Sequence, residues 1–212
     1  MSMDYGRLVA SHLLQIKAIR LNAKNPFTWA SGIRSPIYCD NRISLSYPHV
    51  RSDIKKALVE LSNRFPPFEV IAGVATAGIP HGALLADTLG LPFIYIRSKA
   101  KKHGRKNLIE GKVEGGEKVL VIEDLISTGG SSIQAIQALN EAGAEVIGLA
   151  AIFTYQMDFA EKRFQDLEIQ VETITDYTRL IDAAVEENHV EGDDLELLKA
   201  WRESPSSWDP GS

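Results

Sequence analysis

The chain has 212 residues, of which 44% are hydrophobic and 24% are charged. This length suits one domain, which we take as residues 1–212. The net charge of −5 argues against a general nucleic-acid binder. The longest apolar runs, such as residues 146–153, are too short to cross a membrane, so no membrane partner is expected.

The number of cysteines and the N-terminal sequence indicate in which cellular compartment the protein is expected. Cys39 is the single cysteine, so an internal disulfide is impossible. The N-terminal residues lack the basic start and apolar core of a secretory signal. We therefore expect a cytoplasmic, reducing environment.

The first quarter of the chain predicts two helices with irregular structure between them. Apolar residues recur at helical spacing over residues 4–20 and again over 52–64. Residues 25–42, NPFTWASGIRSPIYCDNR, are rich in Pro, Gly, Ser and aromatic residues, which favours loops with short strands.

The middle of the chain alternates between short apolar runs and amphipathic segments. Such alternation predicts an α/β fold, in which a mostly parallel sheet is covered by helices on both faces. The expected strands are residues 69–74, 91–97, 118–124 and 145–153. The expected helices are residues 79–90 and 131–143, and the tail after residue 177 also has helical character to about 204.

Two loops follow expected strands at their C-terminal ends, where ligands collect in parallel sheets. They are ATAG at 75–78 and LISTGG at 125–130. In the second, glycines let backbone amides converge, hydroxyl groups add donors, and a helix N-terminus follows, which together suit a phosphate monoester. An ordinary capped strand-to-helix turn is the alternative. The required lysine of a P-loop is missing, and no GxGxxG occurs.

Glu123 and Asp124 stand directly before the second loop. Carboxylates beside a phosphate site repel the phosphate unless they serve another part of the ligand. Vicinal sugar hydroxyls would satisfy them, and the carboxylates would also stabilise positive charge on a ribose ring. A ribose 5-phosphate unit fits both features.

Residues 97–118 hold eight Lys or Arg residues against three Glu, and several glycines. The segment is longer than a usual connection between strands. It is either a solvated surface loop or a mobile lid that places positive charge over a polyphosphate. The histidines show no metal-ligand spacing, and Cys39 has no spaced partners, so no direct protein metal site is expected.

Residues 119–131, VLVIEDLISTGGS, resemble the phosphoribosyl pyrophosphate signature of type I phosphoribosyltransferases. Residues 97–104, RSKAKKHG, look like the catalytic loop of the orotate phosphoribosyltransferase family. Residues 25–42 look like its N-terminal hood, and residues 73–86 resemble its pyrophosphate loop. The resemblance implies the type I phosphoribosyltransferase fold, with a hood near 20–45, a mobile loop near 98–116 and a helical tail over 177–212.

The resemblance also implies an activity. Members of this family convert orotate and phosphoribosyl pyrophosphate (PRPP) into orotidine 5′-monophosphate and diphosphate, in de novo pyrimidine (UMP) biosynthesis. It further implies Mg²⁺, held mainly through substrate and water, and a homodimer whose catalytic loops act in trans. Two rival hypotheses remain open: a transferase for another base, and a non-catalytic nucleotide sensor that keeps the fold.

Roles for individual residues follow from the same resemblance. Arg97, Lys101 and His103 would contact the pyrophosphate group from the partner subunit. Glu123 and Asp124 would hold the ribose hydroxyls, and Ser127 would also contact orotate. The 5′-phosphate would be bound by Leu125, Ile126, Ser127, Thr128, Gly129, Gly130 and Ser131. A cis peptide bond is expected between Ala75 and Thr76.

Four positions differ from the enterobacterial branch of the family. Ala30 replaces a substrate-binding Lys, Thr76 and Ala77 replace Tyr and Lys, and Tyr155 replaces an orotate-contacting Arg. We interpret these as branch differences that concern the orotate contacts.

Overall fold

The computed structural model describes residues 3–29, 32–99, 108–205 and 207–208. The chain forms two compact units, one made of residues 52–174 and the other of residues 1–51 with 175–212. We refer to them as the sheet unit and the terminal unit. Helix α2 (Pro48–Ser62) leads from the terminal unit into the sheet unit.

The sheet unit is built on a six-stranded sheet with the order β10-β9-β8-β5-β6-β7. Strand β5 pairs in parallel with both β6 and β8, and β8 pairs in parallel with β9, whereas the short β7 is antiparallel to β6. The strands are β5 (Val70–Val74), β6 (Phe93–Ile96), β7 (Ile109–Glu110), β8 (Lys118–Ile126), β9 (Glu145–Thr154) and β10 (Val171–Asp176). The predicted α/β class with a mostly parallel sheet is confirmed.

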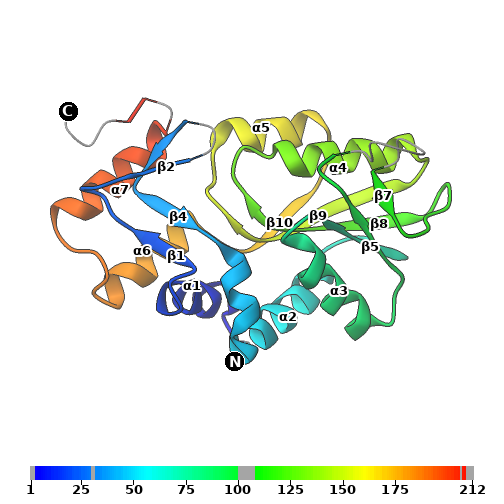
Figure 1. The fold of residues 1–212 in the computed structure, drawn as a ribbon, viewed down its shortest axis with the longest axis horizontal. Helices are drawn as coiled ribbons and strands as arrows, with labels where there is room; N and C mark the ends of the chain where they lie inside the picture. The colour runs from blue at the N-terminus through cyan, green and yellow to red at the C-terminus, as the bar shows by residue number, and fades with distance from the viewer. Residues whose placement is uncertain (1–2, 30–31, 100–107, 206, 209–212) are drawn as a thin grey trace. The chain divides into compact units, whose positions relative to one another are not determined.

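Helices cover both faces of this sheet. α3 (Gly78–Leu89) lies on one side and α4 (Gly130–Glu141) on the other (Figure 1). α5 (Asp158–Asp166) follows β9, and its Phe164 belongs to the same apolar cluster as Ile133 and Ile136 of α4. Because both faces are covered, β5 is buried along its whole length, which explains its Val- and Ile-rich sequence.

The order of the strands reverses between β5 and β8. From β5 the chain passes through α3 to β6, whereas from β8 it passes through α4 to β9, on the opposite side of β5. A reversal of this kind opens a crevice at the C-terminal ends of the two strands, where open α/β sheets bind their ligands. The two loops singled out from the sequence both begin there.

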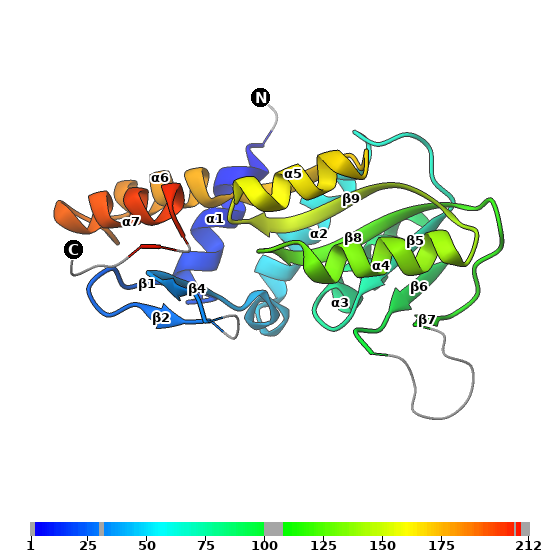
Figure 2. The ribbon, with the colours of Figure 1, turned by 90° about the horizontal axis from the view of Figure 1, so that it is seen from above.

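The terminal unit combines both ends of the chain. α1 (Tyr5–Gln15) and α6 (Tyr177–Glu186) lie side by side (Figure 1 and Figure 2). β1 (Ile19–Leu21) pairs with β4 (Ile37–Cys39), and β2 (Phe27–Thr28) pairs with β3 (Arg34–Ser35), all antiparallel. Short strands joined by loops are what residues 25–42 predicted.

The helix predicted over residues 4–20 is shorter than expected. α1 begins after Asp4, whose side chain accepts a hydrogen bond from the Arg7 amide, and ends at Gln15. Lys17 then adopts a positive φ of 58°, which is incompatible with a continuing helix, and β1 follows at once. Residues 16–18 therefore form a turn, and Ile19 and Arg20 belong to a strand, although the spacing of the apolar residues had indicated a helix.

α7 (Asp193–Glu203) gives the terminal unit its largest buried side chain, Trp201. The Trp201 indole packs against the rings of Trp29 and Tyr177, at centroid distances of 5.7 and 5.4 Å. Its Nε1–H donates a hydrogen bond to the carbonyl of Arg34 at 3.0 Å. The tail thus closes a core that also contains residues from the N-terminal strands.

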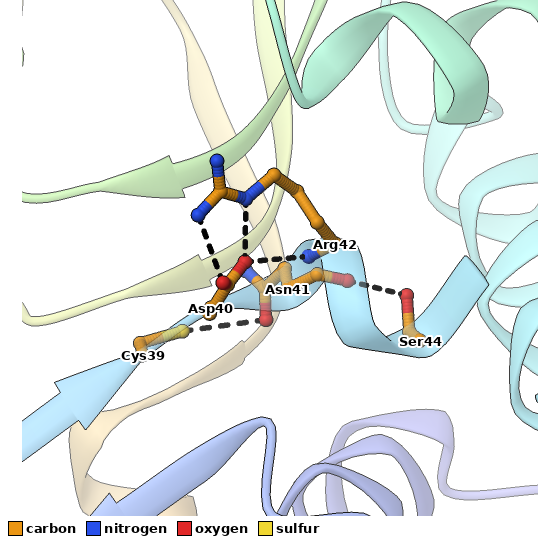
Figure 3. A network of polar contacts seen from close by, with 5 residues as sticks. All are labelled: Cys39, Asp40, Asn41, Arg42 and Ser44. Atoms are coloured by element: carbon orange, nitrogen blue, oxygen red, sulfur yellow. Dashed lines mark hydrogen bonds and ion pairs between the residues drawn. The ribbon is translucent and has the colours of Figure 1, made fainter. Parts of the chain in front are cut away.

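A polar network fixes the turn that follows β4 (Figure 3). The Asp40 carboxylate caps η1 (Asn41–Ser46) by accepting from the Arg42 amide, and it also accepts from Arg42 Nε at 2.6 Å and Nη2 at 2.8 Å. These hydrogen bonds from Arg42 lower the pKa of Asp40. Cys39 Sγ donates to the buried Asn41, and Ser44 Oγ donates to the Asn41 carbonyl. The Cys39 thiol is thus part of a structural turn.

Candidate active site

The loop at residues 75–78 lies directly against the middle of β8, beside Ile122 and Glu123. A Cβ added to Gly78 would meet the Ile122 carbonyl oxygen at 2.5 Å, so only glycine allows this approach. The peptide between Ala75 and Thr76 is cis, as the resemblance implied. The first turn of α3 is therefore held next to Ile122, the residue immediately before Glu123.

The loop at residues 127–130 connects β8 to α4. Gly129 has a φ of +74° and precedes the first helical residue, Gly130. Among the described residues, no side chain caps this helix, so its first amide groups are available to an anion. Ser127 and Thr128 are half-buried and Ser131 is exposed. The arrangement suits a phosphate group.

Two of the predicted phosphate-binding residues belong to β8 itself. The Ile126 side chain is buried in the apolar cluster of the sheet unit, and Leu125 is half-buried. Any contact between Ile126 and a ligand would therefore involve its backbone.

Glu123 lies beneath the loop at residues 127–130, which we call the phosphate loop, and is 4% exposed. Its Oε2 accepts hydrogen bonds from Ser131 Oγ and Ser132 Oγ, both at 3.1 Å, and its Oε1 accepts from the Asp124 amide at 3.2 Å. Burial, followed by the negative charge of Asp124, raises the pKa of Glu123 well above its usual value. The carboxyl group thus ties the end of β8 to the first turn of α4.

Asp124 is half-buried, so its carboxylate is the more accessible of the pair. The Asp124 carboxyl group lies close enough to that of Glu123 for a side-chain hydrogen bond, which adds to the rise in the pKa of Glu123. The two acids nevertheless differ in exposure: Glu123 is held within the protein, whereas Asp124 can meet a ligand.

Arg97 follows β6, and its Nη1 lies 3.4 Å from Glu110 Oε1 of β7. Its backbone amide donates to the Leu108 carbonyl, so Arg97 and Leu108 lie side by side. Lys101 and His103 lie outside the described residues, as does Ala30. Thr76 and Ala77 lie in the loop after β5. Strand β5 is the neighbour in the sheet of β8, which carries the acid pair.

Tyr155 occupies the position that carries an arginine in the enterobacterial branch. It is buried, and its ring stands edge-on to Phe153 at a centroid distance of 5.2 Å. Its amide donates to the Ile126 carbonyl at 3.1 Å, which fixes it beside the end of β8. In this arrangement Tyr155 packs within the sheet unit.

The environment of His81, in the first turns of α3, indicates a structural role. It is almost fully buried, its Nε2 has no hydrogen-bond partner, and burial lowers its pKa to about 4. Over the described part of the chain, no three or more His, Cys, Asp or Glu side chains gather in a way that could hold a metal ion. Nor is any helix in that part long and apolar enough to span a membrane.

Two residues at the phosphate loop were not identified from the sequence. Ser132 is fully buried and bonds to Glu123, and Arg163 Nη1 of α5 donates to the Thr128 carbonyl at 2.9 Å. The extra serine after the signature is a weak signal for the first. The sequence carries no signal for Arg163, because its contact depends on how α5 packs.

Comparison with known proteins agrees with this geometry. The Phosphoribosyl transferase domain family matches residues 46–188. The chain is 53% identical over 207 residues to an orotate phosphoribosyltransferase of Listeria monocytogenes, covering 97% of this chain and 99% of the relative. It is 54% identical over 204 residues to that of Enterococcus faecalis, covering 96% and 97%.

A solved structure shows the same fold. The orotate phosphoribosyltransferase of Aeropyrum pernix superimposes with a TM-score of 0.75 at 24% identity, covering 86% of this chain and 99% of that one. Together, the reversal of the sheet order, the two loops, the acid pair and these similarities show that the chain belongs to the orotate phosphoribosyltransferase family.

Proposed function

We propose that this protein transfers the phosphoribosyl group of PRPP to orotate, giving orotidine 5′-monophosphate and diphosphate in pyrimidine biosynthesis. The observation that carries the proposal is the position of an acid pair and a phosphate loop at one strand end, where the sheet order reverses. The identity of more than 50% to orotate phosphoribosyltransferases supports orotate as the base.

In the proposed reaction, the bond between ribose C1′ and the diphosphate oxygen breaks, and a bond from C1′ to an orotate nitrogen forms on the opposite face. The ribose ring carries positive charge in the transition state. Asp124 is the accessible carboxylate that would accept hydrogen bonds from the ribose hydroxyls and stabilise this charge. Glu123, bound by two serine hydroxyls, supports the same strand end.

The 5′-phosphate would be held by residues 125–131, with the free amides at the start of α4 as donors. Ser127, in the same loop, would also contact orotate. The loop at residues 75–78 would face the diphosphate, because the close approach at Gly78 brings it next to the acid pair.

The residues present fit a Mg²⁺ ion that is bound mainly by substrate. Asp124 is the one accessible carboxylate of the pair, and Mg²⁺ commonly keeps several waters while binding one or two carboxylates and phosphate oxygens. When bound, the ion would neutralise charge on the diphosphate.

We further propose a homodimer in which the basic loop, near residues 98–116, closes over the neighbouring site. Arg97, Lys101 and His103 would then bring positive charge to the departing diphosphate, and the closed loop would exclude water. The high density of Lys and Arg between residues 97 and 118 supports this assignment.

Incubation of the purified protein with orotate, PRPP and Mg²⁺ tests the reaction. Formation of orotidine 5′-monophosphate, and no product from adenine, guanine, hypoxanthine or uracil, would support it. If the folded protein formed no orotidine 5′-monophosphate, the proposal would fail. Turnover with another base would favour the first rival hypothesis.

Mixed dimers test the shared site. Lys101→Ala and Asp124→Asn subunits should each be nearly inactive alone, whereas a mixed dimer has one intact site if the loop acts in trans. Recovery of part of the activity on mixing is expected. Absence of recovery, with mixed dimers demonstrated by mass spectrometry, would contradict the shared site, and full activity of Lys101→Ala would favour a non-catalytic role for the loop.

A further inference from the structure

Helix α5 contacts the phosphate loop through two consecutive residues. Arg163 Nη1 donates a hydrogen bond to the Thr128 carbonyl oxygen at 2.9 Å. The ring of its neighbour Phe164 packs against Gly129, where an added Cβ would stand 3.0 Å from two ring carbons. The loop is thus held from the side by a helix that begins about 30 residues later in the chain.

The hydrogen bond acts on the peptide that joins Thr128 to Gly129. A peptide unit is planar and trans, so its carbonyl and its N–H point in opposite directions. When Arg163 holds the Thr128 oxygen on the side of α5, the Gly129 N–H is directed to the opposite side of the loop. That N–H stands at the start of α4, among the amides available to an anion.

A restraint from α5 matters because the glycines of the loop do not fix its backbone conformation. Gly129 has a φ of +74° and is followed by Gly130, and glycine moves between backbone conformations more freely than any other residue. Among the described residues, no side chain caps α4, and the hydrogen bonds from Ser131 and Ser132 to Glu123 hold the first turn of the helix, not the peptide between Thr128 and Gly129. Arg163 and Phe164 supply the missing restraint.

We propose that Arg163 is a positioning residue for the phosphate loop, which holds the peptide between Thr128 and Gly129 in the orientation that binds the 5′-phosphate of PRPP. The inference rests on the proposed function, because it concerns the same site. Arg163 acts through the backbone of the loop and need not touch the substrate.

The experiment compares Arg163→Gln and Arg163→Lys with Lys162→Gln as a matched control. Lys162 is exposed and adjacent on the same helix, so its substitution removes the same charge without touching the loop. Isothermal titration with PRPP and Mg²⁺ gives the affinity, and steady-state kinetics gives kcat and both KM values. Hydrogen exchange of the peptide that covers residues 125–133 reports on the loop directly.

Loss of one hydrogen bond from a charged donor should weaken PRPP binding about 5- to 10-fold in Arg163→Gln. The orotate KM and kcat should stay within about twofold of wild type, because the restrained peptide joins Thr128 to Gly129 and lies after Ser127, the proposed orotate contact. Lys162→Gln should match wild type. Arg163→Lys, which keeps the charge and one donor, should recover most of the affinity. Loop amides should exchange faster in Arg163→Gln alone.

The inference is overturned if Arg163→Gln and Lys162→Gln bind PRPP equally well, or if Arg163→Gln weakens PRPP and orotate to the same extent, which would indicate general loosening. Unchanged exchange of the loop amides would overturn it as well. A wild-type protein that forms no orotidine 5′-monophosphate would instead refute the proposed function. The exchange comparison would still test the restraint from α5 in that case, so the two failures are distinguishable.

Discussion

The contact between Gly78 and Ile122 allows a sharp test of how closely the two loops of the site must approach. In Gly78→Ala, the new Cβ would stand 2.5 Å from the Ile122 carbonyl oxygen, whereas ordinary contact begins at 3.4 Å. The first turn of α3 and β8 at Ile122 must therefore separate by about 0.9 Å. Overpacking of this size costs about 1–3 kcal/mol of unfolding free energy.

The larger effect of Gly78→Ala should be on catalysis. Ile122 precedes Glu123, so the displacement moves the loop at residues 75–78 relative to the acid pair. A misplacement near 1 Å can lower a rate about 100-fold, and we expect kcat/KM for PRPP to fall about 10- to 100-fold. Steady-state kinetics, with thermal unfolding measured in parallel, gives both quantities.

Gly90→Ala, at the other end of α3, is the control. Gly90 has a φ of +67° and no atom within 4 Å of an added Cβ, so the substitution strains the backbone by about 1 kcal/mol without moving β8. It should lower the unfolding temperature and leave kcat/KM near wild type. The reasoning would be refuted if Gly78→Ala retained wild-type kcat/KM, or if Gly90→Ala lost as much.

Three further changes test other parts of the structure. Trp201→Ala should cost about 3–5 kcal/mol in urea unfolding, because a fully buried indole and its hydrogen bond are lost, and a cost below about 1 kcal/mol would contradict this. The pKa of Glu123 is raised in the folded state, so the unfolding free energy of the wild type should fall as pH rises through that pKa. Urea unfolding at several pH values should show this fall in the wild type and not in Glu123→Gln. The same pH dependence in both proteins would contradict the assignment to Glu123. Ser132→Ala removes one hydrogen-bond donor to Glu123 and should lower kcat/KM for PRPP about fivefold. Ser62→Ala, at another buried serine, should leave kcat/KM unchanged. Equal kinetics in the two variants would exclude a role of Ser132 in positioning Glu123.

Much of the sheet unit could be predicted because its signals are local. The expected strand at 118–124 corresponds to β8 at Lys118–Ile126, and the expected helix at 131–143 to α4 at Gly130–Glu141. Buried parallel strands need continuous Val and Ile, and that requirement is visible in the sequence. Helix α5 and strand β10 carry weaker patterns, since only Ala160 and Phe164 of α5 are buried, and they were not predicted.

The same contrast between local sequence signals and contacts that depend on packing applies to the site. The phosphate loop and the acid pair are contiguous in the chain, so their chemistry could be inferred from residues 119–131 alone. The different environments of Glu123 and Asp124 could not, because burial and the hydrogen bonds from Ser131 and Ser132 arise only when α4 packs on β8. Arg163 reaches Thr128 across 35 residues, a distance that no local pattern spans.

The division of the chain into two units has a consequence for its synthesis. Residues 52–174 are continuous, so the sheet unit can fold as soon as that stretch has left the ribosome. The terminal unit must wait, since its N-terminal strands gain Trp201 only after residues 175–203 are made. During that interval Trp29 and the Arg34 carbonyl lack the indole that contacts them in the complete protein, so an aromatic ring and a backbone acceptor of the nascent N-terminal segment have not yet gained this partner.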